Sequence, residues 1–442
     1  KQRRKDDTAV IFQDLKDEKP LPVQMLIDHR KASVTEIDED ESAVIVHQDL
    51  PWDRSQPVYN DTGTYTIIEA EDSKLWLDHL TDLQPGMTLE QENYIGRLTD
   101  LFAKFGDEWR SRWDRNFNVD PDRWDPIVQF AELALPRPEP MPYQRITKEE
   151  WLRALKSKKK HAATGPDGVS RQDLLHLPDQ VTDSLLNMLN EIEMGASWPR
   201  QLVLGIAAAL AKIPTASQTK HYRPITILPV IFRTWSSIRA RQILNHLQPL
   251  APPTCAGSVP GRQAADIWYH IMANIEIAQF AQTDLAGGVV DLEKAFNMLP
   301  RVPVMAFMRI LNVAPPILRA WSKALISLER RFTIHQCTGP PIRSTTGFAE
   351  GCSLSVTSML AANIVVHQYM LRRYPAAMLW TFVDNWEITG SNAEVVVQAL
   401  DGLHALCHAM DMVIDDSKSY TWSVNAVQRR SFRDQQLQVK LA

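Results

Sequence analysis

Two carboxylates in this sequence follow apolar runs of the kind that form strands. Asp291 closes the run GGVVD, and Asp384 follows MLWTFV in the stretch TFVDNWEITG. Runs of this length predict buried strands, and one central sheet can bring the ends of two distant strands together. Two neighbouring carboxylates at such an edge can hold a pair of Mg²⁺ ions about 4 Å apart, which activate a hydroxyl group and stabilise a leaving pyrophosphate.

Each acid also has an ordinary structural interpretation. Asp384 and Asn385 stand between two apolar runs, and such a pair often forms only the turn of a hairpin, because both residues tolerate turn backbone angles. Asp291 precedes a helix-like stretch, where an acid is often the N-cap. Neither acid taken alone separates a catalytic site from turn or cap chemistry.

Two cations stand on a second predicted hairpin. The stretch ALAKIPTASQTKHYRPITIL reads as two strands joined by a polar loop, with Lys212 near the end of the first strand and Arg223 at the start of the second. Cations facing each other across a hairpin suit a triphosphate, because Arg offers a bidentate fork and Lys a point charge. The alternative is surface charge on an exposed ribbon.

The elements that must position these groups follow one another in a fixed order. A strand ends at Asp291 and a helix follows. TTGFAEGCSLSVTSMLAANIVVHQYMLRRY then predicts a Gly-rich turn that opens a long helix, and the Asp384 hairpin comes next. A last helix around AEVVVQALDGLHALCHAM leads into a strand expected to carry Lys418. This order predicts a small antiparallel sheet backed by helices over residues 276–425.

Composition narrows the class of protein. With 442 residues and 44% hydrophobic content, the chain can bury a full core in two or three structural units. We find no apolar run of 18 residues and no secretory signal, so neither a membrane span nor a membrane partner is expected. The four cysteines are scattered, which favours reduced thiols inside the cell over a structural zinc site. The chain begins at Lys1, so we expect a fragment.

Charge and pattern divide the first third of the chain. Residues 1–75 carry a net charge of about −7 and contain short strand-like runs, SAVIVHQ and GTYTIIEA, whose role the sequence does not assign. The remainder is slightly basic, which is compatible with a groove that binds phosphates. Residues 76–145 read as a Trp-rich helical segment, helical from about Thr88, followed by the Pro-rich linker LALPRPEPMPYQ.

From about Ile146 to Trp422 the chain resembles the reverse transcriptase domain of non-LTR retrotransposons and group II introns. Seven blocks match that family in order: TGPDGVS, YRPITIL, GSVPGRQAADI, VVDLEKAFN, GFAEGCSLS, FVDN and IDDSKSY. The resemblance implies an α+β right-hand fold, with fingers at 146–275 and a palm at 276–425. The thumb would be largely absent, since 426–442 could hold only its start.

The same resemblance implies an activity. The chain would be an RNA-directed DNA polymerase that uses Mg²⁺ or Mn²⁺, an RNA template, a DNA primer and dNTPs. It would work inside the cell, in a nuclear or cytoplasmic ribonucleoprotein. Asp291 and Asp384 would be the metal ligands, with the backbone of Leu292 as a further ligand. Phe296 falls where the family has a steric gate, a ring that fills the space of a ribose 2′-hydroxyl and so favours dNTP over rNTP.

Further site residues follow from the matched blocks. Arg223, with Lys212, would grip the triphosphate. The turn at Glu350 and Gly351 would lie beneath the nascent base pair, and Lys418 would be a proton donor to pyrophosphate.

Three positions depart from the family pattern. Glu350 stands where the family usually has Gln, Asn297 replaces an Asp, and Asn385 replaces the second acid of the hairpin. We interpret the site as functional, because both metal-bridging acids and the gate are present. Two alternatives remain. A non-catalytic RNA-binding scaffold predicts loss of Asp291 or Phe296, and an RNA-dependent RNA polymerase predicts a smaller or polar residue at Phe296.

Overall fold

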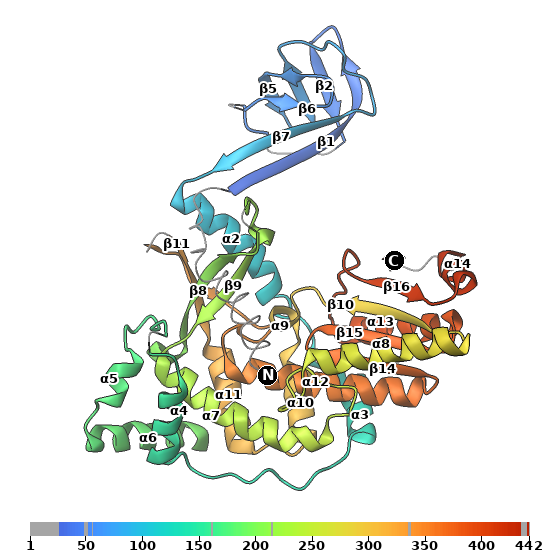
Figure 1. Ribbon diagram of the computed structural model, residues 1–442. Coiled ribbons are helices and arrows are strands. Elements are labelled where there is room, and N and C mark those ends of the chain that lie inside the picture. Colours follow the sequence, from blue (N-terminus) through green and yellow to red (C-terminus); the bar gives the residue numbers. More distant parts are fainter. Residues whose placement is uncertain are drawn as a thin grey trace. The chain divides into compact units, whose positions relative to one another are not determined.

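A computed structural model describes residues 26–47, 52–54, 56–160, 162–213, 215–334, 337–434 and 440–441 (Figure 1). The described residues form two compact units, each with its own sheet and hydrophobic core. The first unit takes its residues from 1–108, 208–224 and 332–340, and the second from 109–207, 225–331 and 341–442.

The first unit is built on a seven-stranded sheet in the order β4-β3-β7-β1-β2-β6-β5. Its strands are β1 (Leu26–Asp38), β2 (Ala43–Val46), β3 (Val58–Tyr59), β4 (Thr64–Tyr65), β5 (Ile67–Glu71), β6 (Lys74–Leu77) and β7 (Thr88–Ile95). Alternate residues of these strands, such as Val44 and Val46, are buried in one core. The strands expected from SAVIVHQ and GTYTIIEA are therefore confirmed.

The expectation of a helix from Thr88 onward is wrong at its start. Thr88–Ile95 pairs along its whole length with β1 and buries Leu89 and Gln91, which are two residues apart as a strand requires. The helix α2 begins only at Leu98 and ends at Trp113. Its aromatic residues form the expected packing face, since Phe105, Trp109 and Trp113 are fully buried.

The second unit contains the sheet that carries both candidate acids. Its order is β14-β15-β10-β16-β17, and all neighbours are antiparallel except β16 and β17. The strands are β10 (Ala286–Asp291), β14 (Ala377–Phe382), β15 (Asn385–Gly390), β16 (Tyr420–Ser423) and β17 (Lys440–Leu441). Helices α12 (Ser353–Arg373), α13 (Ala393–Ala409) and α8 (Ala264–Ala281) pack against the sheet (Figure 1).

The other helices of the second unit complete its core. They are α3 (Asp125–Ala134), α4 (Lys148–Ser157), α5 (Arg171–Leu175), α6 (Asp179–Met194), α7 (Val230–Leu247), α9 (Ala295–Met298), α10 (Arg301–Ile310), α11 (Pro315–Ser327) and α14 (Ala426–Asp434). The core includes a buried ion pair between Arg239 and Glu193. Helix α12 is long and apolar enough to cross a membrane, but 78% of its most apolar window is buried inside the protein, as in a core helix.

A third sheet contains the predicted cationic hairpin. Its order is β12-β11-β8-β9, with β13 paired to β11. Its strands are β8 (Leu204–Ala211), β9 (Tyr222–Ile227), β11 (Glu329–Ile334), β12 (Cys337–Thr338) and β13 (Ile342–Arg343). The two strands predicted from the Lys212 stretch are confirmed as β8 and β9. As a whole, the described chain is a mixed α/β fold with antiparallel sheets.

Candidate active site

The two acids lie at the ends of adjacent strands. β10 and β15 are antiparallel neighbours, and Asp291 is paired with Asn385, the residue after Asp384. The Leu292 N–H donates to the Asp384 carbonyl at 3.3 Å. The fold therefore places two aspartates that are far apart in sequence at the same end of two adjacent strands.

The turn that carries Asp384 is one residue earlier than the sequence indicated. Phe382 pairs with Asn385, so the two loop residues are Val383 and Asp384, and Asn385 begins β15. Val383 has a φ of 59°. A β-branched residue in this region is strained, at a cost on the order of 1–3 kcal/mol. Asp and Asn suit such angles better, and so the sequence pattern misplaced the turn.

Side chains from two elements hold the strained turn. The Val383 carbonyl accepts a hydrogen bond from Asn363 Nδ2 at 3.0 Å and another from Trp386 Nε1 at 3.3 Å. Trp386 Nε1 is also 3.1 Å from Asn363 Oδ1. Asn363 and Trp386 are both buried, the first on α12 and the second on β15. This network fixes the carbonyl immediately before Asp384.

Gly257 packs against the backbone of the turn. The N–H groups of Ala256 and Gly257 donate to the Thr381 carbonyl at 3.0 and 3.3 Å. A Cβ on Gly257 would lie 1.9 Å from the Val383 nitrogen, so only glycine fits. Sequence reasoning assigned no role to this residue, although it stands in the matched block GSVPGRQAADI.

Lys418 contacts the first acid. It lies in a turn just before β16, not within the strand as expected. Its Nζ is 2.8 Å from Asp291 Oδ2 and 2.6 Å from Asp415 Oδ2. Hydrogen bonds to Asp291 and then to Asp415 raise the pKa of Lys418 to about 12. A fully charged ammonium group therefore stands beside one of the two carboxylates.

The face of the sheet that carries Asp291 is turned away from α13. Gly288 and Asp291 lie on opposite faces of β10, because residues an odd number of positions apart in a strand point to opposite sides. Gly288 faces Leu400 of α13. Val289 is in phase with Asp291 and pairs with Glu387. Burial raises the pKa of Glu387 to about 7, although a hydrogen bond from Trp422 Nε1 at 3.0 Å acts to lower it. The sequence pattern gave no signal for this carboxyl group.

A hollow adjoins this face between α8 and the sheet. Its lining is mainly apolar and aromatic, with two polar side chains, and consists of Ala264, Ile267, Trp268, Ile271, Val289, Trp380, Phe382, Asn385, Trp386 and Glu387. Asn385 is exposed here. It shares its strand position with Asp291 through their pairing, so an acid at this position would face the same side of the sheet.

Phe296 lies on α9, beside the Gly-rich turn. The Phe348 N–H donates to the Phe296 carbonyl at 2.6 Å, and the Gly347 N–H donates to the Leu299 carbonyl at 3.1 Å. Phe296 is half-buried against the main core of its unit. The predicted steric gate, Phe296, therefore lies next to the segment that leads into the turn at Glu350 and Gly351.

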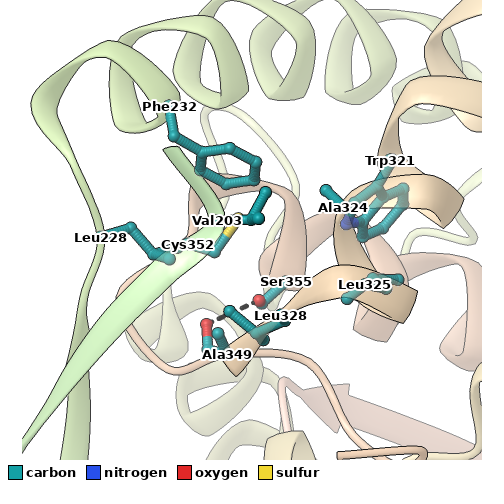
Figure 2. Close-up of a pocket in the computed structure, with 10 residues that line it drawn as sticks. All are labelled: Val203, Leu228, Phe232, Trp321, Ala324, Leu325, Leu328, Ala349, Cys352 and Ser355. Atoms are coloured by element: carbon teal, nitrogen blue, oxygen red, sulfur yellow. Dashed lines mark hydrogen bonds between the residues drawn. The ribbon is translucent and has the colours of Figure 1, made fainter. Parts of the chain in front are cut away.

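The turn at Glu350 and Gly351 packs against β9. The Thr226 N–H donates to the Glu350 carbonyl at 2.7 Å. Gly351 has a φ of 107°, and a Cβ there would lie 2.4 Å from the Thr226 carbonyl oxygen. Behind the turn is the apolar hollow of Figure 2, where Ser355 Oγ donates to the Ala349 carbonyl at 2.8 Å. The turn is thus held on both sides.

Lys212 and Arg223 are both exposed on the cationic hairpin. The Lys212 N–H donates to the His221 carbonyl at 2.8 Å, and Lys212 Nζ lies 3.3 Å from the Lys220 carbonyl. This part of the hairpin belongs to the first unit, whereas Asp291 and Asp384 belong to the second. A joint role of the cations and the acids stays a prediction.

The donor set fits a metal held partly by substrate. Among the residues that the structure describes, no group of three or more His, Cys, Asp or Glu side chains could form a metal cage. Mg²⁺ is usually bound by one or two carboxylates together with waters and substrate phosphates, and not by a cage made only of protein ligands. A metal held in that mode by Asp291 and Asp384 stays a prediction.

Comparisons with known proteins give a distant likeness. No family model matches the sequence. Among solved structures, the chain is similar to an apo telomerase from Candida tropicalis described as "truncated from C-terminal domain", with 11% identity and a TM-score of 0.40. The match covers 55% of this chain and 56% of the telomerase chain, so it spans just over half of each. A likeness this distant carries no conclusion about activity.

Proposed function

We propose that this chain is an RNA-directed DNA polymerase of a retrotransposon-like element, which transfers nucleotides from dNTPs to a primer 3′-hydroxyl. The observation that carries the proposal is the placement of Asp291 and Asp384 at adjacent strand ends, where a strained and well-supported turn holds the second acid. Strain of this kind persists where the surrounding structure enforces it, and it clusters at functional sites.

In this proposal, Asp291, Asp384 and the Leu292 carbonyl would hold Mg²⁺ or Mn²⁺. When bound, the metal pair favours the alkoxide form of the primer hydroxyl and neutralises charge on the leaving pyrophosphate. Asp291 already makes an ion pair with Lys418, so that ammonium lies within reach of a phosphate bound at the acids. Lys418 would then donate a proton to the pyrophosphate oxygen.

The remaining residues would select and align the nucleotide. Phe296 would exclude a ribose 2′-hydroxyl, and Arg223 with Lys212 would bind the triphosphate. The turn at Glu350 and Gly351 would support the nascent base pair. The β10–β14–β15–β16 sheet would correspond to a palm, and the β8–β9 hairpin to part of the fingers.

Primer extension tests the proposal most directly. The full chain is incubated with an RNA template, a DNA primer, Mg²⁺ and either dNTPs or rNTPs, and Asp291→Asn is compared with the parent. We expect dNTP-dependent extension that falls by at least about 10³-fold in the variant, as when a metal-bridging charge is removed. Asp401→Asn, an exposed acid on α13, is the matched control and should retain activity.

The two alternatives give different results. An RNA-binding scaffold would bind template without extending the primer, with or without Asp291. An RNA-dependent RNA polymerase would extend with rNTPs in preference to dNTPs. Either outcome would replace the proposed function.

A further inference from the structure

Two of the departures from the family pattern contact each other. Asn297 is fully buried, and its Nδ2 donates to Glu350 Oε1 at 2.5 Å. Its Oδ1 accepts from Trp113 Nε1 at 2.8 Å. An indole N–H can only donate, and an ionised carboxylate can only accept. The amide of Asn297 is therefore used at both ends, and its orientation is set by its two partners.

The hydrogen bonds at positions 297 and 350 can be satisfied by few pairs of residue types, because each bond needs one donor and one acceptor. With Glu350 ionised, residue 297 must accept from Trp113 and donate to the carboxylate, which Asn can do and an ionised Asp cannot. If residue 350 were Gln, its own N–H could donate to an Asp at 297, which would still accept from Trp113. The Asn–Glu and Asp–Gln pairs satisfy the same bonds, with the carboxylate moved from one partner to the other.

A buried cation adds a second constraint on this network. The Arg330 guanidinium lies 4.2 Å from the Trp113 ring centroid and is fully buried. Its three nitrogen atoms have no hydrogen-bond partner among the described residues. Burial lowers the pKa of Arg330 to about 9, and the charge of Glu350 opposes that shift. The Glu350 carboxylate and the Trp113 ring thus both stabilise the charge of a buried cation.

The network joins the two segments that the proposed function uses for nucleotide selection. Asn297 follows Phe296, whose carbonyl accepts from Phe348, and Glu350 precedes Gly351 in the turn against β9. Gly347 is also fixed here, because a Cβ on it would lie 2.1 Å from the Asn297 carbonyl oxygen. A break between Asn297 and Glu350 would remove the side-chain hydrogen bond that supplements the backbone bonds between these segments.

We infer that Asn297 and Glu350 form a reciprocal positioning pair, in which the exchange of amide and acid preserves the link between the Phe296 segment and the Gly351 turn. Glu350 is then a structural partner of Asn297 and Arg330. The effect on nucleotide selection rests on the proposed function, whereas the pairing itself does not.

A double-mutant cycle tests the pairing without any need for activity. Thermal unfolding is measured for the parent, Asn297→Asp, Glu350→Gln and the double variant. Asn297→Asp alone places two carboxylates in contact and should lower the unfolding midpoint by at least about 5 °C. The double variant should recover at least half of that loss, because Gln donates to Asp and the negative charge near Arg330 is kept.

A matched control separates pairing from general destabilisation. Asn190 is another buried Asn of the second unit, and its Oδ1 accepts from the Ile146 N–H at 3.1 Å. Asn190→Asp combined with Glu350→Gln should show additive shifts. If the Asn297→Asp and Glu350→Gln shifts are also additive, the reciprocal pair is overturned.

Nucleotide selection provides a second, independent readout. In a protein that extends primers, Asn297→Asp should raise the KM for dNTP more than it lowers kcat, and the double variant should restore the KM. Coupled stability without extension in the parent would leave the pair intact and refute the polymerase. Extension with an unchanged KM would limit the pair to a stabilising role and overturn its positioning role.

Discussion

The backbone of Gly257 lies directly against the backbone of Val383, so that a single added methyl group would come within 1.9 Å of the Val383 nitrogen. The atoms that a Cβ would meet also include Phe382 Cα and the Phe382 carbonyl carbon, and backbone atoms in a sheet cannot move aside as a flexible side chain can. The position of Asp384 therefore depends on a residue that carries no chemistry. The conformation of the turn is set by the close contact of Gly257 with the Val383 backbone and by the hydrogen bond from the Asn363 amide to the Val383 carbonyl.

Gly257→Ala should displace the turn and lower primer extension by at least about 10-fold, because small displacements of catalytic groups are costly. Activity is measured beside thermal unfolding, so that a local effect can be told from loss of the fold. Ser258→Gly is the matched control one residue on. Ser258 has a φ of 67°, and its buried hydroxyl has no hydrogen-bond partner among the residues that the structure describes, so glycine there should be neutral or stabilising. Equal effects of the two substitutions would contradict this account.

Glu387→Gln should alter the pH dependence of stability. Burial raises the pKa of Glu387 from an ordinary value of 4.5 to about 7, so the folded state binds a proton that the unfolded state releases between these pH values. The contribution of Glu387 to the stability of the parent should therefore fall as pH rises from about 4.5 to 7, and then level off. Gln mimics the protonated form and can still accept from Trp422.

Urea unfolding at pH 5 and pH 8 measures this effect. The Gln variant should be more stable than the parent at pH 8 by about 1–3 kcal/mol, and similar to it at pH 5. A Gln variant that is no more stable than the parent at pH 8 would mean that Glu387 is solvated and ionised in the folded protein.

The sequence predicted the strands at the site better than it predicted their turn. Apolar runs located the ends of β10 and β14, because a strand buried in a central sheet is apolar along its length and the run stops where the strand ends. The turn was misplaced because Val383 adopts an angle that local preferences oppose, and only tertiary contacts from Gly257 and Asn363 impose it. The pairing of Asn297 with Glu350 was likewise hidden, because residues that are 53 positions apart meet only in the fold.

The helix predicted over Thr88–Ile95 was wrong for a different reason. Its sequence, TLEQENYI, is largely polar, and the aromatic helix that follows extended the apparent helical pattern backwards. Pairing with β1 decides the structure here, and single-sequence patterns contain no information about a partner more than 50 residues away.

Phe296→Ala should raise rNTP incorporation relative to dNTP by one or more orders of magnitude, or about 1–3 kcal/mol of lost discrimination. The reason is steric, because the ring would otherwise overlap a 2′-hydroxyl. Competitive single-nucleotide extension on one template gives the ratio directly, and Phe296→Tyr, which keeps a ring, should stay close to the parent. Phe296 is half-buried against the core. If the Ala variant loses stability but keeps the parent's sugar preference, Phe296 is a core residue and not a gate.

The substitutions Asn385→Asp and Asp384→Asn separate a working site from an inactive relic. Asp384 lies in the loop beside Leu292, whereas Asn385 begins β15 opposite Asp291. Asn385→Asp would put a like charge across from Asp291 at a cost of less than about 1 kcal/mol, so activity should stay within a few-fold of the parent. Asp384→Asn should lose at least about 10³-fold, because it removes a metal-bridging charge. Single-nucleotide extension with saturating primer and template measures both variants.

If Asn385→Asp raises activity a hundredfold, the amide has impaired this enzyme, and the acidic pair is required after all. If neither substitution alters a background rate, the site is a relic.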